Sequence, residues 1–352
     1  MAPAPKFQHG GYDKPWLSYR DQLETLRARG LSITDDDKAL DYLQRIGYYR
    51  LSGYWFPFRQ RSEACCAWPR RRKGQKAKDG RVERIALDEF KPGATFRDAV
   101  ALYVFDKQLR LLVMDALERI EVAFRVDISH TLGEHGAFAY LDPGHLFEAF
   151  AQEINQKTGI TDHQAWLQKQ AVMINRSKEE FIRHNKEKYG LPLPIWIACE
   201  VWDFGTLSTL YDGMRQDDQD RIAARYGVRD GRVLASWLRS LNYLRNVCAH
   251  HSRLWNRNMV DQPAKPIMGD VPHFETAWQK GHEHQLARVF VLLCVMKHLL
   301  TTINPSSSWW ERLKALLHAF PDLSHVGVDL HGMGVIEGWE HWEWPVRPYS
   351  GH

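Results

Sequence analysis

The chain has 352 residues, of which 44% are hydrophobic and 26% charged, and its formal net charge is only +4. This composition is typical of a soluble globular protein, and the length allows two domains or one large core with insertions. Because the net charge is small, a protein that is basic over its whole surface is excluded, and any surface for nucleic acid must come from local clusters of Lys and Arg.

Residues 1–94 are predicted to form a helical, aromatic N-terminal subdomain. An amphipathic pattern predicts a short helix over 15–30 that stops at Gly30. A second helix is predicted to start near 34–37, where hydroxyl and carboxylate oxygens suit a helix N-terminus. The stretch 48–58 is dense in aromatic residues, and its periodicity does not separate helix from strand.

Residues 59–84 are strongly basic. They carry ten Lys or Arg and three acidic residues, so their local charge of ten minus three is +7. A segment this polar cannot pack, which predicts a loop that is flexible or ordered by a partner. A solvated insertion without a role is one interpretation. Contact with a polyanion is favoured, with Arg70, Arg71, Arg72 and Lys73 as candidate residues.

A strongly helical pattern follows from Thr95 to about Gly133, and Thr95 can cap the start of this long helix. The polar face of the helix carries pairs of opposite charge spaced four residues apart. Such pairs contribute about 0.3–0.5 kcal/mol each at a surface, and more when buried. The pairs are Asp106 with Arg110 and Glu121 with Arg125.

Residues 134–193 are more polar and are interpreted as an insertion. They include a predicted helix over 162–188 that ends in a basic run containing Arg183 and Lys186. No convincing succession of alternating strands appears, so the predicted class is mainly α with little β. Further apolar helices are predicted over 195–211, 231–250 and about 283–303.

The last segment, residues 306–352, is rich in tryptophan, of which the chain has 14 copies. Tryptophan is favoured at interfaces and for base stacking, but here we expect it to hold a terminal subdomain together. An adaptor protein built on this segment is a weaker alternative.

Cysteine spacing and hydropathy favour the reducing environment of the cytoplasm. The five cysteines include no CxxC pair, and the adjacent Cys65 and Cys66 cannot readily bridge one another. The N-terminal residues lack the apolar core of a signal peptide, and no run of 18 apolar residues occurs. We therefore expect a cytoplasmic protein without a membrane partner.

Residues 245–250 read Arg-Asn-Val-Cys-Ala-His at the end of an apolar helical pattern. Arg245 can hold a phosphate by two parallel hydrogen bonds. Histidine side chains titrate near neutral pH, and His250 can move the proton of a ribose 2′-hydroxyl. These groups suffice to cleave RNA without a metal. The alternative is an ordinary helix C-terminus, where Arg and His interact well with the negative end of the helix dipole.

The five-residue spacing sets a geometric condition on this motif. Five residues along an ideal helix rotate a side chain by about 140°. Arg245 and His250 therefore share no face unless the helix distorts or ends near His250. Alternatively, the pair acts on something lodged between two bodies, which a homodimer that joins two such helix ends would supply.

Other catalytic patterns are missing from the sequence. His282-Glu283-His284 and the adjacent His250-His251 lack the HExxH spacing of a zinc site, and neither a nucleophile elbow nor a phosphate-binding loop occurs. We expect no metal and no cofactor.

Short blocks in one order along nearly the whole chain carry a resemblance to a known family. They are Lys14-Pro15-Trp16-Leu17-Ser18, Ile46-Gly47-Tyr48-Tyr49-Arg50-Leu51-Ser52-Gly53-Tyr54-Trp55, Glu118-Arg119-Ile120-Glu121-Val122-Ala123-Phe124-Arg125, Pro194-Ile195-Trp196 with Phe204-Gly205-Thr206-Leu207-Ser208, and Arg245-Asn246 with His250-His251-Ser252-Arg253-Leu254-Trp255-Asn256. The chain resembles the bacterial abortive infection (Abi) proteins of the AbiD/AbiF type, which are similar to the HEPN superfamily. That resemblance implies a HEPN-like helical bundle over 95–305, homodimers, and cleavage of RNA through an Arg-x4-6-His motif.

The resemblance also implies roles for single residues. Arg245 would bind the scissile phosphate and His250 would act as the acid or base. Asn246 would orient the phosphate or the histidine, and Glu121 or Arg125 would support the site. Further RNA contacts are expected at Arg125, His251, Arg253, Tyr48, Tyr49, Arg50, Arg183 and Lys186.

The implied function is a metal-independent endoribonuclease of phage defence or of toxin–antitoxin type. Attack of the 2′-hydroxyl would leave a 2′,3′-cyclic phosphate, and a bound small noncoding RNA would regulate the enzyme. The alternative is a non-catalytic HEPN protein that forms a ribonucleoprotein with a structured RNA.

Overall fold

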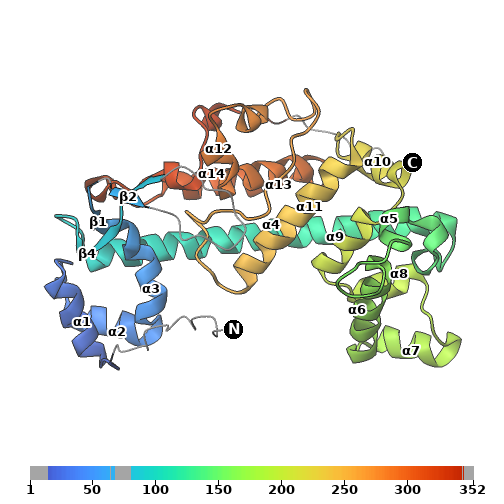
Figure 1. Ribbon diagram of the computed structural model, residues 1–352, viewed down its shortest axis with the longest axis horizontal. Helices are drawn as coiled ribbons and strands as arrows, with labels where there is room; N and C mark the ends of the chain where they lie inside the picture. Colours follow the sequence, from blue (N-terminus) through green and yellow to red (C-terminus); the bar gives the residue numbers. More distant parts are fainter. Residues whose placement is uncertain (1–14, 64, 68–80, 343, 345–352) are drawn as a thin grey trace, which may run out of the picture. The chain divides into compact units, whose positions relative to one another are not determined.

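Helix α4 (Phe96–His135) is the longest helix in the described part of the computed structural model, and it runs without a break (Figure 1). Its first turns belong to one compact unit of the chain, and the remainder belongs to a second unit. The domain boundaries proposed from the sequence stay a prediction. The units comprise residues 1–103 with 321–328 and residues 104–320 with 329–352. The structure describes residues 15–63, 65–67, 81–342 and 344.

The first unit combines short helices with two small antiparallel β-ribbons. Strand β1 pairs with β4, and β2 pairs with β3. Before the ribbons lie α1 (Tyr19–Ala28), α2 (Asp36–Arg45), α3 (Tyr48–Trp55) and the 3₁₀ helix Phe56–Phe58. The strands are β1 (Arg59–Arg61), β2 (Cys65–Ala67), β3 (Arg81–Glu83) and β4 (Ala86–Phe90), and the 3₁₀ helix Ser324–Val326 completes the unit.

Local signals place the helices of this unit. The Ser18 hydroxyl accepts a hydrogen bond from the Asp21 N–H at 3.2 Å, which caps the start of α1. Gly30 follows that helix with a φ of 89°, as its predicted stop requires. The aromatic stretch that periodicity left undecided is helical, and it buries Trp55 against Phe96, with the ring centroids 6.0 Å apart.

The basic stretch 59–84 begins and ends in the two β-ribbons. Arg59 lies opposite Phe90 across the first ribbon. The residues predicted to contact a polyanion lie outside the described part of the chain. They are Arg70, Arg71, Arg72 and Lys73.

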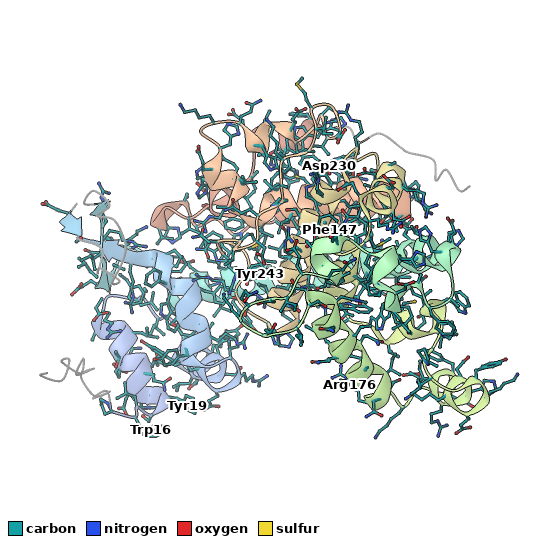
Figure 2. The ribbon with its side chains drawn as sticks, turned by 45° about the vertical axis from the view of Figure 1, so that its right-hand side comes forward. Trp16, Tyr19, Phe147, Arg176, Asp230 and Tyr243 are labelled. Atoms are coloured by element: carbon teal, nitrogen blue, oxygen red, sulfur yellow. The ribbon has the colours of Figure 1, made fainter. Side chains whose placement is uncertain are left out.

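The second unit is built from helices that follow α4. The central one is α11 (Gly231–Ala249), which contacts α9, α10 and α13. In Figure 2, Asp230 marks the residue before α11 and Tyr243 lies toward its other end. The others are α5 (Glu148–Ala151), α6 (Asp162–Arg176), α7 (Glu180–Tyr189), α8 (Ile195–Ala198), α9 (Phe204–Asp212), α10 (Gln216–Arg225), α12 (Glu283–Leu286), α13 (Val289–Ile303) and α14 (Trp309–His318). Short 3₁₀ helices lie at Ala139–Leu141, Pro143–His145, Cys199–Val201, Glu275–Trp278, Leu330–Met333 and Trp339–His341.

Three stretches predicted as single helices are each divided into two, so these predictions were wrong in detail. Ser177 takes an extended conformation and ends α6. Asp203 starts α9, because its carboxylate accepts the Thr206 N–H at 2.7 Å. A capping side chain of this kind starts a new helix even where the apolar pattern of the sequence continues without interruption. The breaks fall within 162–188, 195–211 and 283–303.

The prediction of a mainly α fold is confirmed. That this fold is a HEPN-like bundle stays a prediction. Among the helices described, none is both long and apolar enough to cross a lipid bilayer.

Candidate functional site

Helix α11 ends at the sequence motif. His250 is the C-cap, the Ser252 N–H donates to the Val247 carbonyl at 3.0 Å, and the His251 N–H donates to the Cys248 carbonyl at 2.9 Å. These two bonds form a Schellman motif, which reverses the chain after the helix. The helix thus ends beside His250, which is one of the geometries that the spacing of the motif allows.

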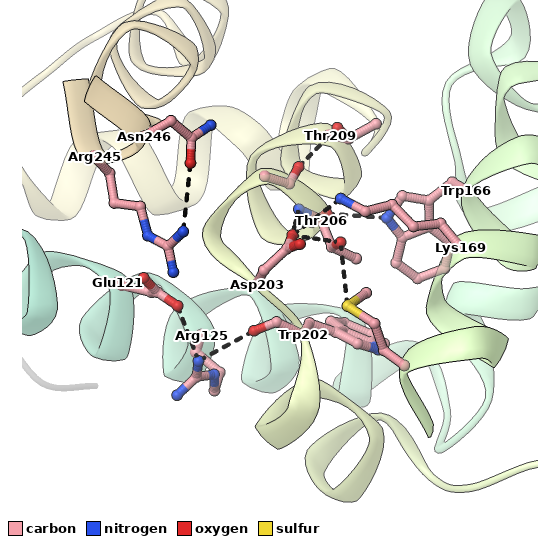
Figure 3. A network of polar contacts seen from close by, with 12 residues as sticks. Glu121, Arg125, Trp166, Lys169, Trp202, Asp203, Thr206, Thr209, Arg245 and Asn246 are labelled. Atoms are coloured by element: carbon pink, nitrogen blue, oxygen red, sulfur yellow. Dashed lines mark hydrogen bonds and ion pairs between the residues drawn. The ribbon is translucent and has the colours of Figure 1, made fainter. Parts of the chain in front are cut away.

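The polar side chains of the motif divide between solvent and interior. His250 and His251 are exposed, whereas Arg245 and Asn246 are half-buried. The Arg245 Nη1 donates to the Asn246 Oδ1 at 3.4 Å. In Figure 3 the Arg245 guanidinium extends from α11 toward Glu121 on α4. One helix end therefore combines an exposed imidazole with a fixed, partly desolvated cation.

Helix α4 supplies a charged pair beneath Arg245. Arg125 Nη2 lies 3.3 Å from Glu121 Oε1 and donates to the Trp202 carbonyl at 3.3 Å (Figure 3). The predicted i,i+4 pair is thus present, and both side chains are mostly buried. Burial raises the pKa of Glu121, although the positive charges of Arg125 and Arg245 oppose that shift. Glu200 Oε2 also lies 3.9 Å from Arg125 Nη1, so the carboxylates of Glu121 and Glu200 balance the charges of Arg125 and Arg245.

Asp203 joins this charged group, and sequence patterns had not singled it out. It accepts hydrogen bonds from Lys169 Nζ at 3.1 Å and from Thr206 Oγ1 at 2.7 Å (Figure 3). Burial opposes ionisation of Asp203, but these hydrogen bonds outweigh it and hold its pKa below the ordinary value. A Cβ at Gly205 would lie 3.3 Å from the Asn242 amide of α11, so glycine lets the two helices approach closely. The family block that begins one residue later, at Phe204, is the sequence feature that could have pointed to Asp203.

The segment after the motif is held by a second buried charge of α4. The Asp106 carboxylate accepts the Leu254 N–H at 3.1 Å and the Trp255 N–H at 2.7 Å, and it pairs with Arg110. Arg110 also donates to the Ser252 carbonyl at 3.3 Å. Both side chains are buried, so of the two cases that the spacing left open, a surface pair and a buried pair, this is the buried one. This pair fixes the chain that leaves the motif.

The remaining candidate RNA contacts belong to other elements of the chain. Tyr48, Tyr49 and Arg50 belong to α3 of the first unit, where Tyr49 is 83% exposed. On α7, Arg183 is exposed, while Lys186 Nζ donates to the Ile174 carbonyl at 2.8 Å and so serves the end of α6. The residues brought together are Arg245, Asn246, Glu121 and Arg125, and Arg253 follows them on the segment that Asp106 holds.

Among the described residues, no three His, Cys, Asp or Glu side chains are arranged to hold a metal ion. In the His282-Glu283-His284 run, the His284 ring contacts the His331 carbonyl at 2.9 Å.

A family model described as "Abi-like protein" matches residues 41–256, which is more than half of the chain. The matched range contains α4, the Asp203 region and the motif at 245–250. No curated protein and no solved structure matches the chain.

Proposed function

We propose that this chain, which belongs to the Abi-like protein family, acts in phage defence by abortive infection and does so as a metal-independent endoribonuclease. One observation carries the enzymatic part. The half-buried Arg245 faces Glu121 of α4, and five residues later α11 ends at the exposed His250. A helix end of this kind supplies both a cation and an imidazole, which can accept and donate a proton.

The chemistry follows from these two side chains. Arg245 binds the scissile phosphate and neutralises the charge that develops on its oxygens. The 2′-hydroxyl attacks the adjacent phosphorus and gives up its proton, and the bond to the 5′-oxygen breaks. The products are a 2′,3′-cyclic phosphate and a 5′-hydroxyl, which takes up a proton. Proton transfer by His250 contributes a factor of about 10²–10⁴, and Asn246 orients the phosphate or the imidazole.

The glutamate and the second arginine support this site from below. Glu121 lies between Arg125 and Arg245, so its charge keeps both guanidiniums in place. Arg125 is tied to the Trp202 carbonyl and therefore links α4 to the segment that starts α9.

The spacing of the motif favours a homodimer. Because Arg245 turns inward and His250 is exposed beyond the helix end, two copies that meet at this end would enclose an RNA strand between them. A small noncoding RNA is proposed as the regulator, and the basic stretch 59–84 supports this choice by its local charge of +7, ten basic minus three acidic residues.

The test is incubation of the purified protein with single-stranded RNA in EDTA, followed by mass spectrometry of the products. We expect fragments that end in 2′,3′-cyclic phosphate, and we expect His250→Ala and Arg245→Gln to abolish them. His325→Ala is the matched control, because this histidine is exposed and lies in the other unit.

Two outcomes would contradict the proposal. One is no cleavage by the parent protein, and the other is cleavage that His250→Ala leaves unchanged. RNA binding without any cyclic-phosphate product would favour the non-catalytic RNA-binding alternative.

A further inference from the structure

Two arginines lie close together just beyond the motif. Arg253 follows α11, and Arg288 precedes α13 as its N-cap residue. Burial lowers the pKa of Arg288, and the positive charge of Arg253 lowers it further. The guanidinium of Arg288 also donates to the carbonyl of Asn256, which ties it to the segment that carries Arg253.

The residues around Arg288 and Asn256 in the chain carry buried polar atoms without a hydrogen-bond partner. They lie on two segments that the Met259 N–H joins by donating to the Ala287 carbonyl at 2.9 Å. Each such atom destabilises the fold unless a ligand or water satisfies it. Within the described residues, these atoms are Trp255 Nε1, Asn256 Oδ1, His282 Nδ1, Gln285 Oε1 and Arg288 Nε.

A glycine turn packs directly on this cluster. A Cβ at Gly332 would lie 2.4 Å from the Trp255 ring, and one at Gly334 would lie 2.6 Å from the Arg288 Cβ. Gly334 also has a φ of 77°, which other residues rarely adopt. Only glycine allows this approach, so the turn holds Trp255 and Arg288 in fixed positions.

The charge of the cluster favours an anion. In the described part of the chain, Arg288 forms no ion pair with Asp or Glu. Its side chain does not cap α13, so the positive end of that 15-residue helix adds to the same field. A partly desolvated guanidinium near another cation is unfavourable without a negative partner.

We propose that Arg288 and Arg253 form a second phosphate subsite, which binds a phosphodiester of the RNA strand beside the phosphate that Arg245 holds. This inference rests on the proposed function, because it assigns RNA as the ligand. The chain itself connects the two subsites, since Arg253 lies three residues after His250 on the segment that Asp106 fixes to α4. The unpartnered N–H groups at Trp255 Nε1 and Arg288 Nε would donate hydrogen bonds to the phosphate, whereas Asn256 Oδ1 and Gln285 Oε1 are acceptors that a water would satisfy.

The experiment measures binding rather than cleavage. Fluorescence anisotropy follows a short labelled single-stranded RNA binding to the cleavage-silent His250→Ala protein, at about 50 to 200 mM KCl. Adding Arg288→Gln should weaken binding about tenfold. It should also reduce the slope of log affinity against log salt by about 0.7, as expected for one lost phosphate contact on a single strand. Arg232→Gln is the control, because this arginine is exposed at the opposite end of α11.

Arg253→Gln gives the same test should Arg288→Gln fail to fold by circular dichroism. Parental affinity and slope in the folded variants would overturn the inference. It would also be overturned if inorganic phosphate raised the Tm of the parent but not of Arg288→Gln while RNA affinity stayed unchanged, because the cluster would then hold free phosphate. Absence of cleavage by the parent, with RNA binding that depends on Arg288, would refute the nuclease and leave this subsite standing.

Discussion

His251 occupies a backbone conformation that usually belongs to glycine. Its φ is 55°, and among the residues that the structure describes, no other non-glycine residue has a positive φ. The left-handed conformation costs an ordinary residue about 1–2 kcal/mol. Here it turns the chain at the end of α11, beside the exposed His250. This is the C′ position of the Schellman motif, where the left-handed conformation closes the end of the helix.

Two substitutions separate this backbone strain from the contacts of the side chain. His251→Gly and His251→Ala both remove the imidazole, but only glycine adopts the required φ without strain. We therefore expect the glycine variant to be more stable than the alanine variant by about 1 kcal/mol in urea unfolding. Equal stability would show that the turn relaxes at no cost.

At the scale of elements, α4 organises the site with two charged pairs that differ in their partners. Glu121 and Arg125 lie beneath Arg245 and reach the segment before α9. Asp106 and Arg110 hold the backbone that leaves α11. Helix α4 thus contacts both Arg245, at the beginning of the motif, and the backbone that follows the motif.

Asp106→Asn tests the second pair. It leaves Arg110 buried beside a neutral group, so we expect a loss of about 3–5 kcal/mol in the free energy of unfolding. Cleavage should fall as well, because the chain after His251 loses its anchor. Asp115→Asn is the control on the same helix: its pairs with Arg119 and Arg312 are partly exposed and should contribute less than about 1 kcal/mol. Similar losses in both variants would contradict the role given to Asp106.

At the scale of the whole molecule, the proposed homodimer makes activity depend on concentration. The rate of cleavage per mole of chain should fall on dilution through the range in which analytical ultracentrifugation shows dissociation. A constant rate in solutions that contain only monomer would mean that a single chain holds the complete site.

Sequence signals predicted the parts of this protein that depend on neighbouring residues. Thr95 and Asp98 cap each other at the start of α4, with both bonds at 3.0 Å. Gly30 ends α1, and the apolar pattern before Arg245 is buried along α11. The family resemblance also anticipated the matched Abi-like model. These features follow from caps, periodicity and motif order, all of which are local in the chain.

The sequence by itself therefore determined the mainly α class, the course of α4 and α11, and the family. Only the tertiary structure decided that Asp106 is a buried anchor, that Asp203 joins the site, and that Arg288 lies near Arg253. The physical reason is that two opposite charges spaced i,i+4 have the same sequence pattern whether their helix face is exposed to solvent or buried. Burial and long-range partners, which set the strength of a charge, exist only once the helices have packed.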